Sequence, residues 1–314
     1  MGEKIVCVVG PTASGKTGLG VALAKRYGGE VVSVDSMQIY RGMAIGTAAP
    51  TEEEQQGVPH HMIAIADPRE SFSVARFAAL ATDCIEDILH RGRLPILVGG
   101  TGLYLDAIVR GTVFAPGTQD GAVRRDLQER LEREGIAPLL DELSAIDPAA
   151  AARLAPADEK RILRALEVYR ETGTTITEHN AQTQKIPPRY DASYLGLAFR
   201  EREEQRRRIA LRVSQMAAEG LVDEVRALLA SGVPESATAL QAIGYKELLP
   251  ALRGESTVEE GLADITLRSC QYAKRQLTWL RRNPAIHWIF WEKSPDFEEA
   301  LRLSTEFLTA RGVG

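Results

Sequence analysis

The residues best suited to carry out chemistry lie near the start of the chain, in the stretch Gly10-Pro-Thr-Ala-Ser-Gly-Lys-Thr17. A glycine, four residues and then Gly-Lys-Thr form the pattern of a phosphate-binding loop. Glycines at 10 and 15 let the backbone curl so that successive N–H groups point at an anion. Lys16 offers a positive charge to the outer phosphate, and the Thr17 hydroxyl can ligate a Mg²⁺ ion held between phosphates. The stretch predicts a diphosphate or triphosphate site with Mg²⁺ as cofactor, made by Gly10, Pro11, Thr12, Ala13, Ser14, Gly15, Lys16 and Thr17.

A carboxylate and a hydroxyl follow two further apolar runs. Asp35 ends the run that starts at Glu30, and Thr101 follows the run Leu94 to Val98 after two glycines. In open α/β sheets, ligands lie beyond the carboxyl ends of the strands. We therefore expect Asp35 and Thr101 to face the same crevice as the phosphate loop. Two plainer roles for Asp35 stay open, a helix N-cap and a carboxylate that holds the shell of a Mg²⁺ ion.

The elements that must position these residues alternate between strand and helix. Apolar runs predict strands at 5–9, 30–35, 94–98, 194–199 and 286–291, and a helix leaves the phosphate loop at Lys16. Residues 41–72 are rich in glycine and proline and predict loops, and Gln241 to Lys246 is expected to open a helix. From about 120 to 182 the pattern predicts helices only. We expect an α/β fold with a parallel sheet flanked by helices, similar to P-loop NTPases, that carries an all-helical insertion. The expected domains are 1–116, 117–189 and 190–314.

Positive charge is gathered in four clusters although the whole chain carries a formal net charge of −5. The clusters are Arg124-Arg125, then Lys160, Arg161 and Arg164, then 206–212, and finally 274–282. Residues three or four apart on a helix share a face, and a basic face can follow a phosphate backbone. Each cluster could equally be a solvated helix face paired with glutamates. Charge alone leaves a nucleic-acid groove and ordinary solvated helices both open.

Composition limits the setting. The three cysteines, Cys7, Cys84 and Cys270, are far apart and lack the spacing of a metal site, so we expect three reduced core thiols and a cytoplasmic protein. The chain enters its first strand at once, without the pattern of a signal peptide. No run of 18 or more apolar residues predicts a membrane span. We expect a monomer.

Taken together, these stretches resemble the tRNA dimethylallyltransferase family, also called the tRNA isopentenyltransferase family. The likeness covers nearly the whole chain in order, and the combined set is specific where the phosphate loop alone is generic. Three departures stand out, because Ala44 and Ala49 replace a usual Asp and Lys and Ala155-Pro-Ala-Asp158 replaces a His-Pro-Asn-Asp run. The matching stretches are Gly10–Thr17, Val34–Tyr40, Ile45–Thr47, Pro59–His61, Pro95–Tyr104, Lys160-Arg161 with Arg164–Val168, Ala242–Lys246 and Ala273–Trp279.

The resemblance implies transfer of a dimethylallyl group from dimethylallyl diphosphate to N6 of adenine 37, beside the anticodon of a tRNA. The phosphate loop would then hold the diphosphate leaving group, with Arg212 as a second clamp. Asp35 would act as general base, and Thr101 would hydrogen-bond near the same centre. The residues expected to contact tRNA are Asp35, Ser36, Met37, Gln38, Thr101, Arg124, Lys160, Arg161, Ile162, Leu163 and Arg164, together with the basic helix at 274–282.

Two rival functions fit parts of the sequence. A small-molecule kinase with a phosphate loop would consume ATP but would leave the long basic helices without a role. An RNA-binding regulator would use a nucleotide only as a switch and would form no product. The loop itself does not indicate whether ATP occupies it or whether a phosphoryl group moves.

Overall fold

The computed structural model describes residues 2–115 and 121–313. The chain forms two compact units, one made of residues 1–109 and 189–314 and the other of residues 110–188. We call them the α/β unit and the helical unit. The domain boundary expected at 116–117 lies outside the described residues.

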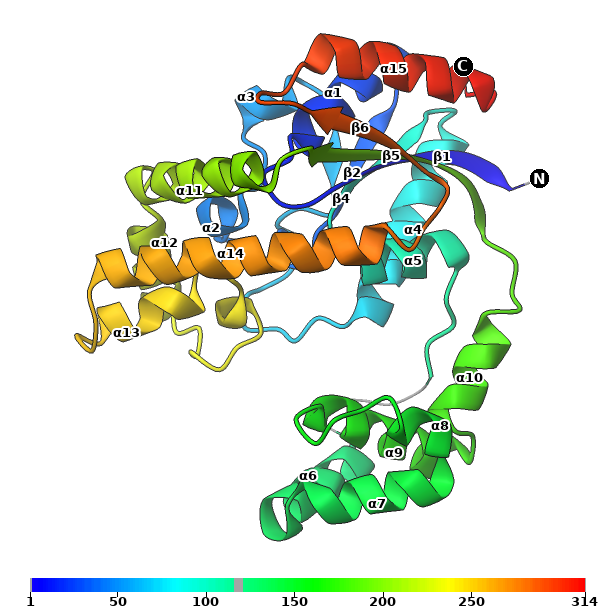
Figure 1. Ribbon diagram of the computed structural model, residues 1–314, viewed down its shortest axis with the longest axis vertical. Helices are drawn as coiled ribbons and strands as arrows, with labels where there is room; N and C mark the ends of the chain where they lie inside the picture. The colour runs from blue at the N-terminus through cyan, green and yellow to red at the C-terminus, as the bar shows by residue number, and fades with distance from the viewer. Residues whose placement is uncertain (1, 116–120, 314) are drawn as a thin grey trace. The chain divides into compact units, whose positions relative to one another are not determined.

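A six-stranded parallel sheet forms the centre of the α/β unit (Figure 1). Its spatial order is β3-β2-β4-β1-β5-β6, so β1 lies between β4 and β5. This arrangement confirms the predicted α/β class with a parallel sheet. The strands are β1 Glu3–Val9, β2 Glu30–Val34, β3 His60–His61, β4 Pro95–Gly99, β5 Tyr190–Phe199 and β6 Ile286–Trp291.

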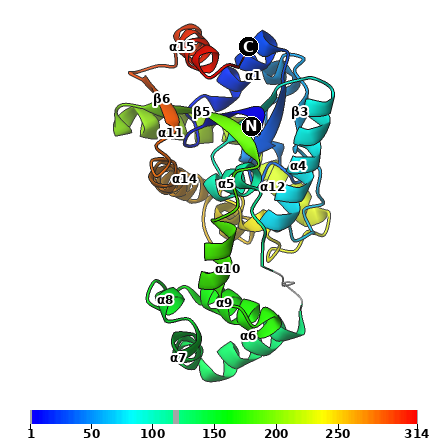
Figure 2. The same ribbon diagram turned by 90° about the vertical axis from the view of Figure 1, so that its right-hand side faces the viewer.

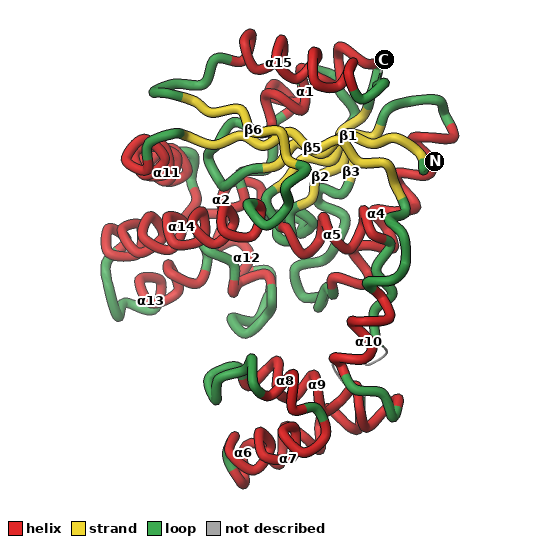
Figure 3. Tube along the Cα trace, turned by 45° about the vertical axis from the view of Figure 1, so that its right-hand side comes forward, coloured by secondary structure: helices red, strands yellow, loops and turns green. Residues whose placement is uncertain are grey.

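Helices cover both faces of the sheet (Figure 3). Helices α1 (Lys16–Tyr27) and α15 (Phe297–Ala310) lie on one face, and they enclose a core with β1, β4, β5 and β6. The other face carries α4 (Val74–His90), α5 (Gly102–Arg110), α11 (Arg202–Ala218) and α14 (Val258–Leu280). Because both faces are covered, the central strands are apolar along their length instead of alternating.

Two segments differ from their expected structure. Residues 41–72, predicted as loops, contain the short helices α2 (Ala44–Thr47) and α3 (Glu52–Gln55) and the edge strand β3. The helix predicted to open at Gln241 does not form, because Ala242 is extended and Gly244 has a φ of 106°. Single turns flank that break, at Ala239–Gln241 and Lys246–Leu248. The remaining helices of the unit are α12 (Leu221–Ala230) and α13 (Leu249–Leu252).

The helical unit contains no strand among its described residues (Figure 2). Apolar side chains of α6, α7 and α9 form a small core around Leu127, Leu139, Leu143 and Leu166. The α9 helix ends at Thr172, and Gly173 caps it in a left-handed conformation with a φ of 71°. Its helices are α6 Ala122–Glu134, α7 Ile136–Ile146, α8 Pro148–Ala151, α9 Glu159–Thr172 and α10 Ile176–Thr183.

The burial of the cysteines agrees only in part with the prediction from the sequence. All three cysteines are free, but only Cys7 is buried, whereas Cys84 and Cys270 are partly exposed. The prediction of three core thiols is therefore wrong for two of them. Over the ranges that the structure describes, no helix is long and apolar enough to cross a membrane.

Candidate active site

Three loops that leave neighbouring strands meet at one edge of the sheet. Strand β4 pairs with β1 on one side and with β2 on the other, and all three run parallel. The phosphate loop follows β1, Asp35 follows β2 and Thr101 follows β4. The topology thus gathers the three candidate segments at the carboxyl ends of adjacent strands, where α/β proteins bind ligands.

The phosphate loop has the backbone that a nest for an anion requires. Gly15 caps the start of α1 with a φ of 85°, and Ala13 also has a positive φ of 60°. A side chain at Gly10 would meet the carbonyl of Leu197 and the hydroxyl of Ser14, so only glycine fits there. The Ser14 hydroxyl is fully buried and has no hydrogen-bond partner within the described chain. Such an orphaned donor fits a site that is completed by a polar ligand.

Lys16 and Arg212 lie close enough at the phosphate loop for their positive charges to repel each other. Lys16 donates from Nζ to the Pro11 carbonyl over 2.7 Å. Burial and the positive charge of Arg212 together lower the pKa of Lys16 to about 7, and the negative charge of Asp35 acts in the opposite direction. Burial also lowers the pKa of Arg212, again opposed by Asp35, although a guanidinium keeps its charge at neutral pH. A bound polyanion would relieve this repulsion, because it would pair with both cations.

Asp35 closes a tight turn and does not cap a helix. Its Oδ1 accepts hydrogen bonds from the backbone N–H groups of Met37, at 2.8 Å, and Gln38, at 3.4 Å. No helix begins between Ser36 and Tyr40. The alternative that Asp35 is a helix N-cap is therefore wrong. Because one oxygen serves the turn, the carboxylate is held in a fixed orientation.

Two adjoining cavities meet at Asp35. The first, which we call the loop cavity, has a volume of about 460 Å³ and is lined by residues 12–18 of the phosphate loop. The second, which we call the wall cavity, has a volume of about 360 Å³ and lies against the segments 46–48 and 241–246 and helices α11 and α14. Both are lined by Thr12, Asp35, Arg212 and Tyr272, with Thr47 and Ala48. A diphosphate bound in the first cavity and an acceptor in the second would share these residues.

Thr101 lies beside the shared wall. Its hydroxyl is buried and makes no well-formed hydrogen bond with the described residues. Burial raises the pKa of the nearby Tyr272 hydroxyl, and the side chains of Thr101 and Gln276 act in the opposite direction. Thr101 thus lines neither of the two cavities, but its hydroxyl lies close to Tyr272, which lines both.

Comparison with known proteins decides the family. A family model described as IPP transferase matches residues 38–283, and one described as isopentenyl transferase matches residues 3–65. The chain is 46% identical over 311 residues to a tRNA dimethylallyltransferase of Halalkalibacterium halodurans, which covers 99% of this chain and 98% of that protein. This chain belongs to the tRNA dimethylallyltransferase family. A relative of the same name from Geobacillus thermodenitrificans is 47% identical over 290 residues, 92% of this chain and 90% of that protein.

Solved structures agree with this membership. The crystal structure of a full-length tRNA isopentenylpyrophosphate transferase from Bacillus halodurans superposes with a TM-score of 0.73 at 44% identity, covering 98% of this chain and 96% of that one. A eukaryotic dimethylallyltransferase captured acting on tRNA gives a TM-score of 0.84 at 29% identity, covering 98% and 80%. The family that the sequence motifs indicate is confirmed.

The residues of this family member that follow Asp35 are not all available to a ligand. Ser36 and Met37 line the wall cavity with Asp35. Gln38 lines the loop cavity, but its amide is engaged by the protein. It accepts from Ser33 over 2.8 Å and donates to the carbonyls of Thr47 and Ala48 over 3.2 and 3.1 Å. In this structure Gln38 braces the wall between the cavities.

The expected RNA contacts of the helical unit divide into exposed and buried side chains. Lys160 and Arg161 are exposed at the start of α9, and the Arg161 side chain is 74% exposed. Ile162 and Leu163 have side chains buried in the core of the unit, and their expected contact with tRNA stays a prediction that would involve the backbone of α9. Their side chains pack α9 against its neighbours.

Arg124 and Arg164 have structural partners in the same unit. Both approach the buried carboxylate of Glu167, at 3.9 and 2.8 Å, and Arg164 also donates to the carbonyl of Ala115 over 2.7 Å. These two cations are therefore partly neutralised by a buried carboxylate, whereas Arg161 pairs with Asp158 over 3.3 Å at the exposed start of α9.

Two buried glutamines at the phosphate loop were missed by the sequence interpretation. Gln205 lies in the apolar stripe of α11 with Ile209 and Val213, and Gln276 lies in the stripe of α14 with Ala273 and Leu280. The sequence offered one signal for them, a glutamine at a position where the helical spacing otherwise places buried apolar residues. Nothing in the sequence indicated what each glutamine would contact.

Proposed function

We propose that this protein transfers a dimethylallyl group from dimethylallyl diphosphate to N6 of adenine 37 in tRNA, beside the anticodon, and releases diphosphate. The observation that carries the proposal is that Asp35 lines both cavities of a family member, one of which is walled by a phosphate loop. Donor and acceptor could thus meet at one carboxylate. The names of the relatives point to the same reaction.

The donor's diphosphate would lie in the loop cavity. Backbone N–H groups of residues 13–17 and the start of α1 offer donors and a partial positive charge to it. Lys16 and Arg212 would neutralise the charge that develops as the C–O bond breaks and its electron pair leaves with the diphosphate. Holding the leaving group in this way lowers the barrier to carbon transfer without any covalent attachment to the protein.

Mg²⁺ is the metal that the diphosphate chemistry favours, and the Thr17 hydroxyl would be its protein ligand. Among the described residues, no group of three or more His, Cys, Asp or Glu side chains could hold a metal by itself. That fits a Mg²⁺ ion bound mainly through substrate phosphates. When bound, the ion would supply charge neutralisation at the leaving group.

The acceptor is a weak nucleophile, because the lone pair of the adenine amine is delocalised into the ring. It needs both a fixed position and removal of a proton as the N–C bond forms. We assign Asp35 as the base that takes the N6 proton and Thr101 as a hydrogen-bonding partner near the same centre. The target base must leave its stack to enter the cavity.

We assign the grip on tRNA to exposed cations, of which Arg275 also lines the wall cavity. Lys160 and Arg161 on the helical unit are exposed, as are Lys274 and Arg275 on α14. Such side chains would pair with backbone phosphates and orient the anticodon arm without reading its sequence. Ser36 and Met37 would lie on the base side of the pocket.

One incubation separates this function from its rivals. The protein is mixed with labelled dimethylallyl diphosphate, Mg²⁺ and unmodified tRNA, and a parallel sample contains ATP in place of the prenyl donor. We expect label on the tRNA and one diphosphate released for each group transferred. Consumption of ATP with a phosphorylated small molecule would support a kinase instead, and tRNA binding without product would support a regulator.

A further inference from the structure

Gln276 joins two of the three loops that form the site. Its side chain is only 6% exposed. Its Oε1 accepts from the backbone N–H of Thr12 over 2.8 Å, and its Nε2 donates to the carbonyl of Gly100 over 3.2 Å. Thr12 belongs to the phosphate loop, and Gly100 immediately precedes Thr101. One amide group therefore spans the gap between the phosphate loop and the loop that carries Thr101.

The chemistry of the two partners makes glutamine specific at this position. A backbone N–H needs an acceptor and a carbonyl needs a donor, so the amide can take only one orientation. A glutamate of the same size would satisfy Thr12 but could not donate to Gly100. At Gly100, a Cβ atom would collide with Nε2 of Gln276, so only glycine leaves room for the bridge.

Gln205 provides an internal comparison, because it holds the same residue of the phosphate loop but makes no hydrogen bond with the described residues of the loop that carries Thr101. Its Nε2 donates to the Thr12 carbonyl over 2.7 Å, and it is 8% exposed. Its Oε1 is buried without a hydrogen-bond partner in the part of the chain that the structure describes. Arg212 adds a third hold on Thr12, from Nη1 to the threonine hydroxyl at 3.3 Å. Gln205 thus holds the phosphate loop to α11 only. Gln276 holds the loop to α14 and also contacts Gly100, the residue that follows β4.

The helix that carries Gln276 also bears residues that face outward. Lys274 and Arg275 are exposed on α14, while Tyr272, one turn before Gln276, lines both cavities. The same rigid helix thus presents cations to solvent and inserts Gln276 between the two loops.

We propose that Gln276 is a positioning residue that fixes the phosphate loop and the Thr101 loop relative to each other, and so sets the separation between prenyl donor and adenine acceptor. This inference rests on the proposed function. Its consequence is specific. Loss of the bridge should slow the bond-forming step more than it weakens the binding of diphosphate, because reacting groups that shift relative to each other lose rate even when each is still bound.

The test compares Gln276→Met with Gln205→Met. Methionine has nearly the length of glutamine and makes no comparable hydrogen bond, so both variants lose one contact to Thr12, and only Gln276→Met also releases Gly100. Single-turnover rates are measured with saturating dimethylallyl diphosphate, Mg²⁺ and unmodified tRNA. The Kd of inorganic diphosphate is measured by calorimetry, and thermal unfolding confirms that each variant is folded.

We expect both variants to weaken diphosphate binding by a similar factor, about three- to tenfold. The single-turnover rate of Gln276→Met should fall at least about tenfold below that of Gln205→Met. Equal rates in the two variants would overturn the inference, since both glutamines would then act on the phosphate loop alone.

Gln276→Glu gives a second reading if the methionine variant does not fold. It keeps the bond from Thr12 and loses the bond to Gly100, so the rate at saturating donor should again fall at least about tenfold. A rate like that of the wild type would contradict the bridge. If the wild-type protein transfers no label, the proposed function fails; if it does and the variants match each other, only the role of Gln276 fails.

Discussion

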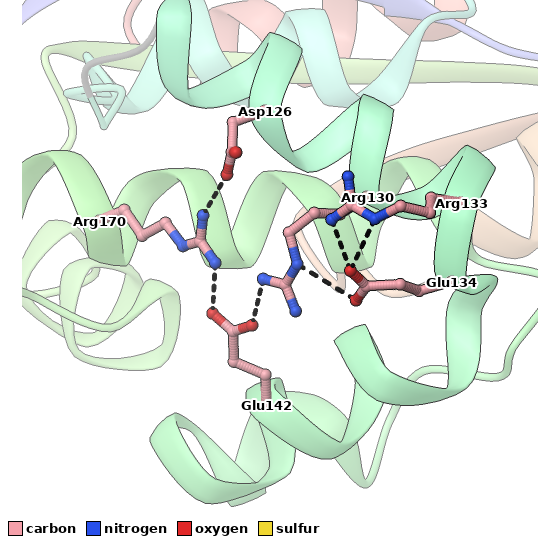
Figure 4. Close-up of polar contacts among 6 residues, drawn as sticks. All are labelled: Asp126, Arg130, Arg133, Glu134, Glu142 and Arg170. Atoms are coloured by element: carbon pink, nitrogen blue, oxygen red, sulfur yellow. Dashed lines mark hydrogen bonds and ion pairs between the residues drawn. The ribbon is translucent and has the colours of Figure 1, made fainter.

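The two units of this protein place their charged residues in different ways. In the α/β unit, Lys16, Asp35 and Arg212 converge on adjoining cavities, where burial lowers the pKa of both cations. In the helical unit, arginines and carboxylates on neighbouring helices pair with each other beside a small core. Glu142 accepts from Arg130 over 2.7 Å and from Arg170 over 2.8 Å (Figure 4). In the α/β unit, a bound anion can relieve the repulsion between the two cations. In the helical unit, paired charges hold the helices together.

This difference gives each unit its own experimental signature. Changes at the cavities should alter chemistry or diphosphate binding, while changes on the helical unit should alter its stability or its grip on RNA. The following changes test that division, starting with the largest expected effect.

Asp35→Asn should reduce turnover by about 10²–10⁴-fold, which is the range for loss of a general base. Asparagine keeps a side-chain oxygen for the turn with Met37 and Gln38, so the local backbone should survive. The Kd for tRNA, measured by filter binding, should stay within about twofold of the wild type. A variant that turns over at a near-normal rate would remove Asp35 as the base.

Diphosphate binding should become pH-dependent through Lys16. The pKa of Lys16 is lowered to about 7 in the free protein, so above that pH the amine is mostly neutral there. A bound anion favours the charged form and raises this pKa, so binding takes up a proton and affinity should fall by up to about tenfold for each pH unit above 7.

Calorimetry in buffers of different ionisation enthalpy measures the number of protons taken up when diphosphate binds. At pH 8 the wild type should take up about one proton more for each diphosphate than Lys16→Arg, whose guanidinium is always charged. Equal uptake by the two proteins would show that Lys16 is already protonated before the ligand arrives.

Glu142→Gln should destabilise the helical unit by about 1–2 kcal/mol, since Arg130 and Arg170 would lose their shared, partly buried partner. Hydrogen exchange in α6, α7 and α9 reports that loss, and exchange in the sheet of the α/β unit should not change. Glu306→Gln, which removes an exposed partner of Arg302 in α15, is the matched control and should leave exchange unchanged.

The effect of Glu142→Gln should also depend on pH. Burial raises the pKa of Glu142, but hydrogen bonds from Arg170 and Arg130 outweigh it, so the pKa is lowered overall. The stability it contributes is present above the unfolded-state pKa and is lost as the pH falls through the folded-state pKa. Wild type and variant should therefore converge in acid, and a difference that persists there would argue for a packing effect.

Arg161→Ala should have the smallest effect. It should weaken tRNA binding a few-fold and reduce the slope of log K against log salt by about one. Arg161 is exposed and its ion pair with a described residue is the one with Asp158 at 3.3 Å, so stability and diphosphate binding should not change. An unchanged salt slope would count against this contact.

The sequence predicts the framework of the α/β unit because its signals are local. The apolar runs, the phosphate loop and the residues that follow β2 and β4 each show their role within a few positions. The fold class and the family are confirmed, while the roles assigned to site residues stay predictions.

Other features depend on contacts that no local pattern contains. Gln276 meets Thr12 across 264 positions and Gln205 meets it across 193. The broken segment at 242–244 was mistaken for a helix start, because its apolar residues serve a cavity wall and not a helical stripe. Ile162 and Leu163 were grouped with basic neighbours that face the opposite side of α9.

The most direct test of the account locates the transferred group. After incubation with labelled dimethylallyl diphosphate and Mg²⁺, the tRNA is digested and its nucleosides are identified by mass spectrometry. A second tRNA, with guanine in place of adenine 37, serves as control. We predict label on N6 of adenine 37 alone and none on the control. Label at another position, equal label on the control, or no label with the wild-type protein would contradict the account.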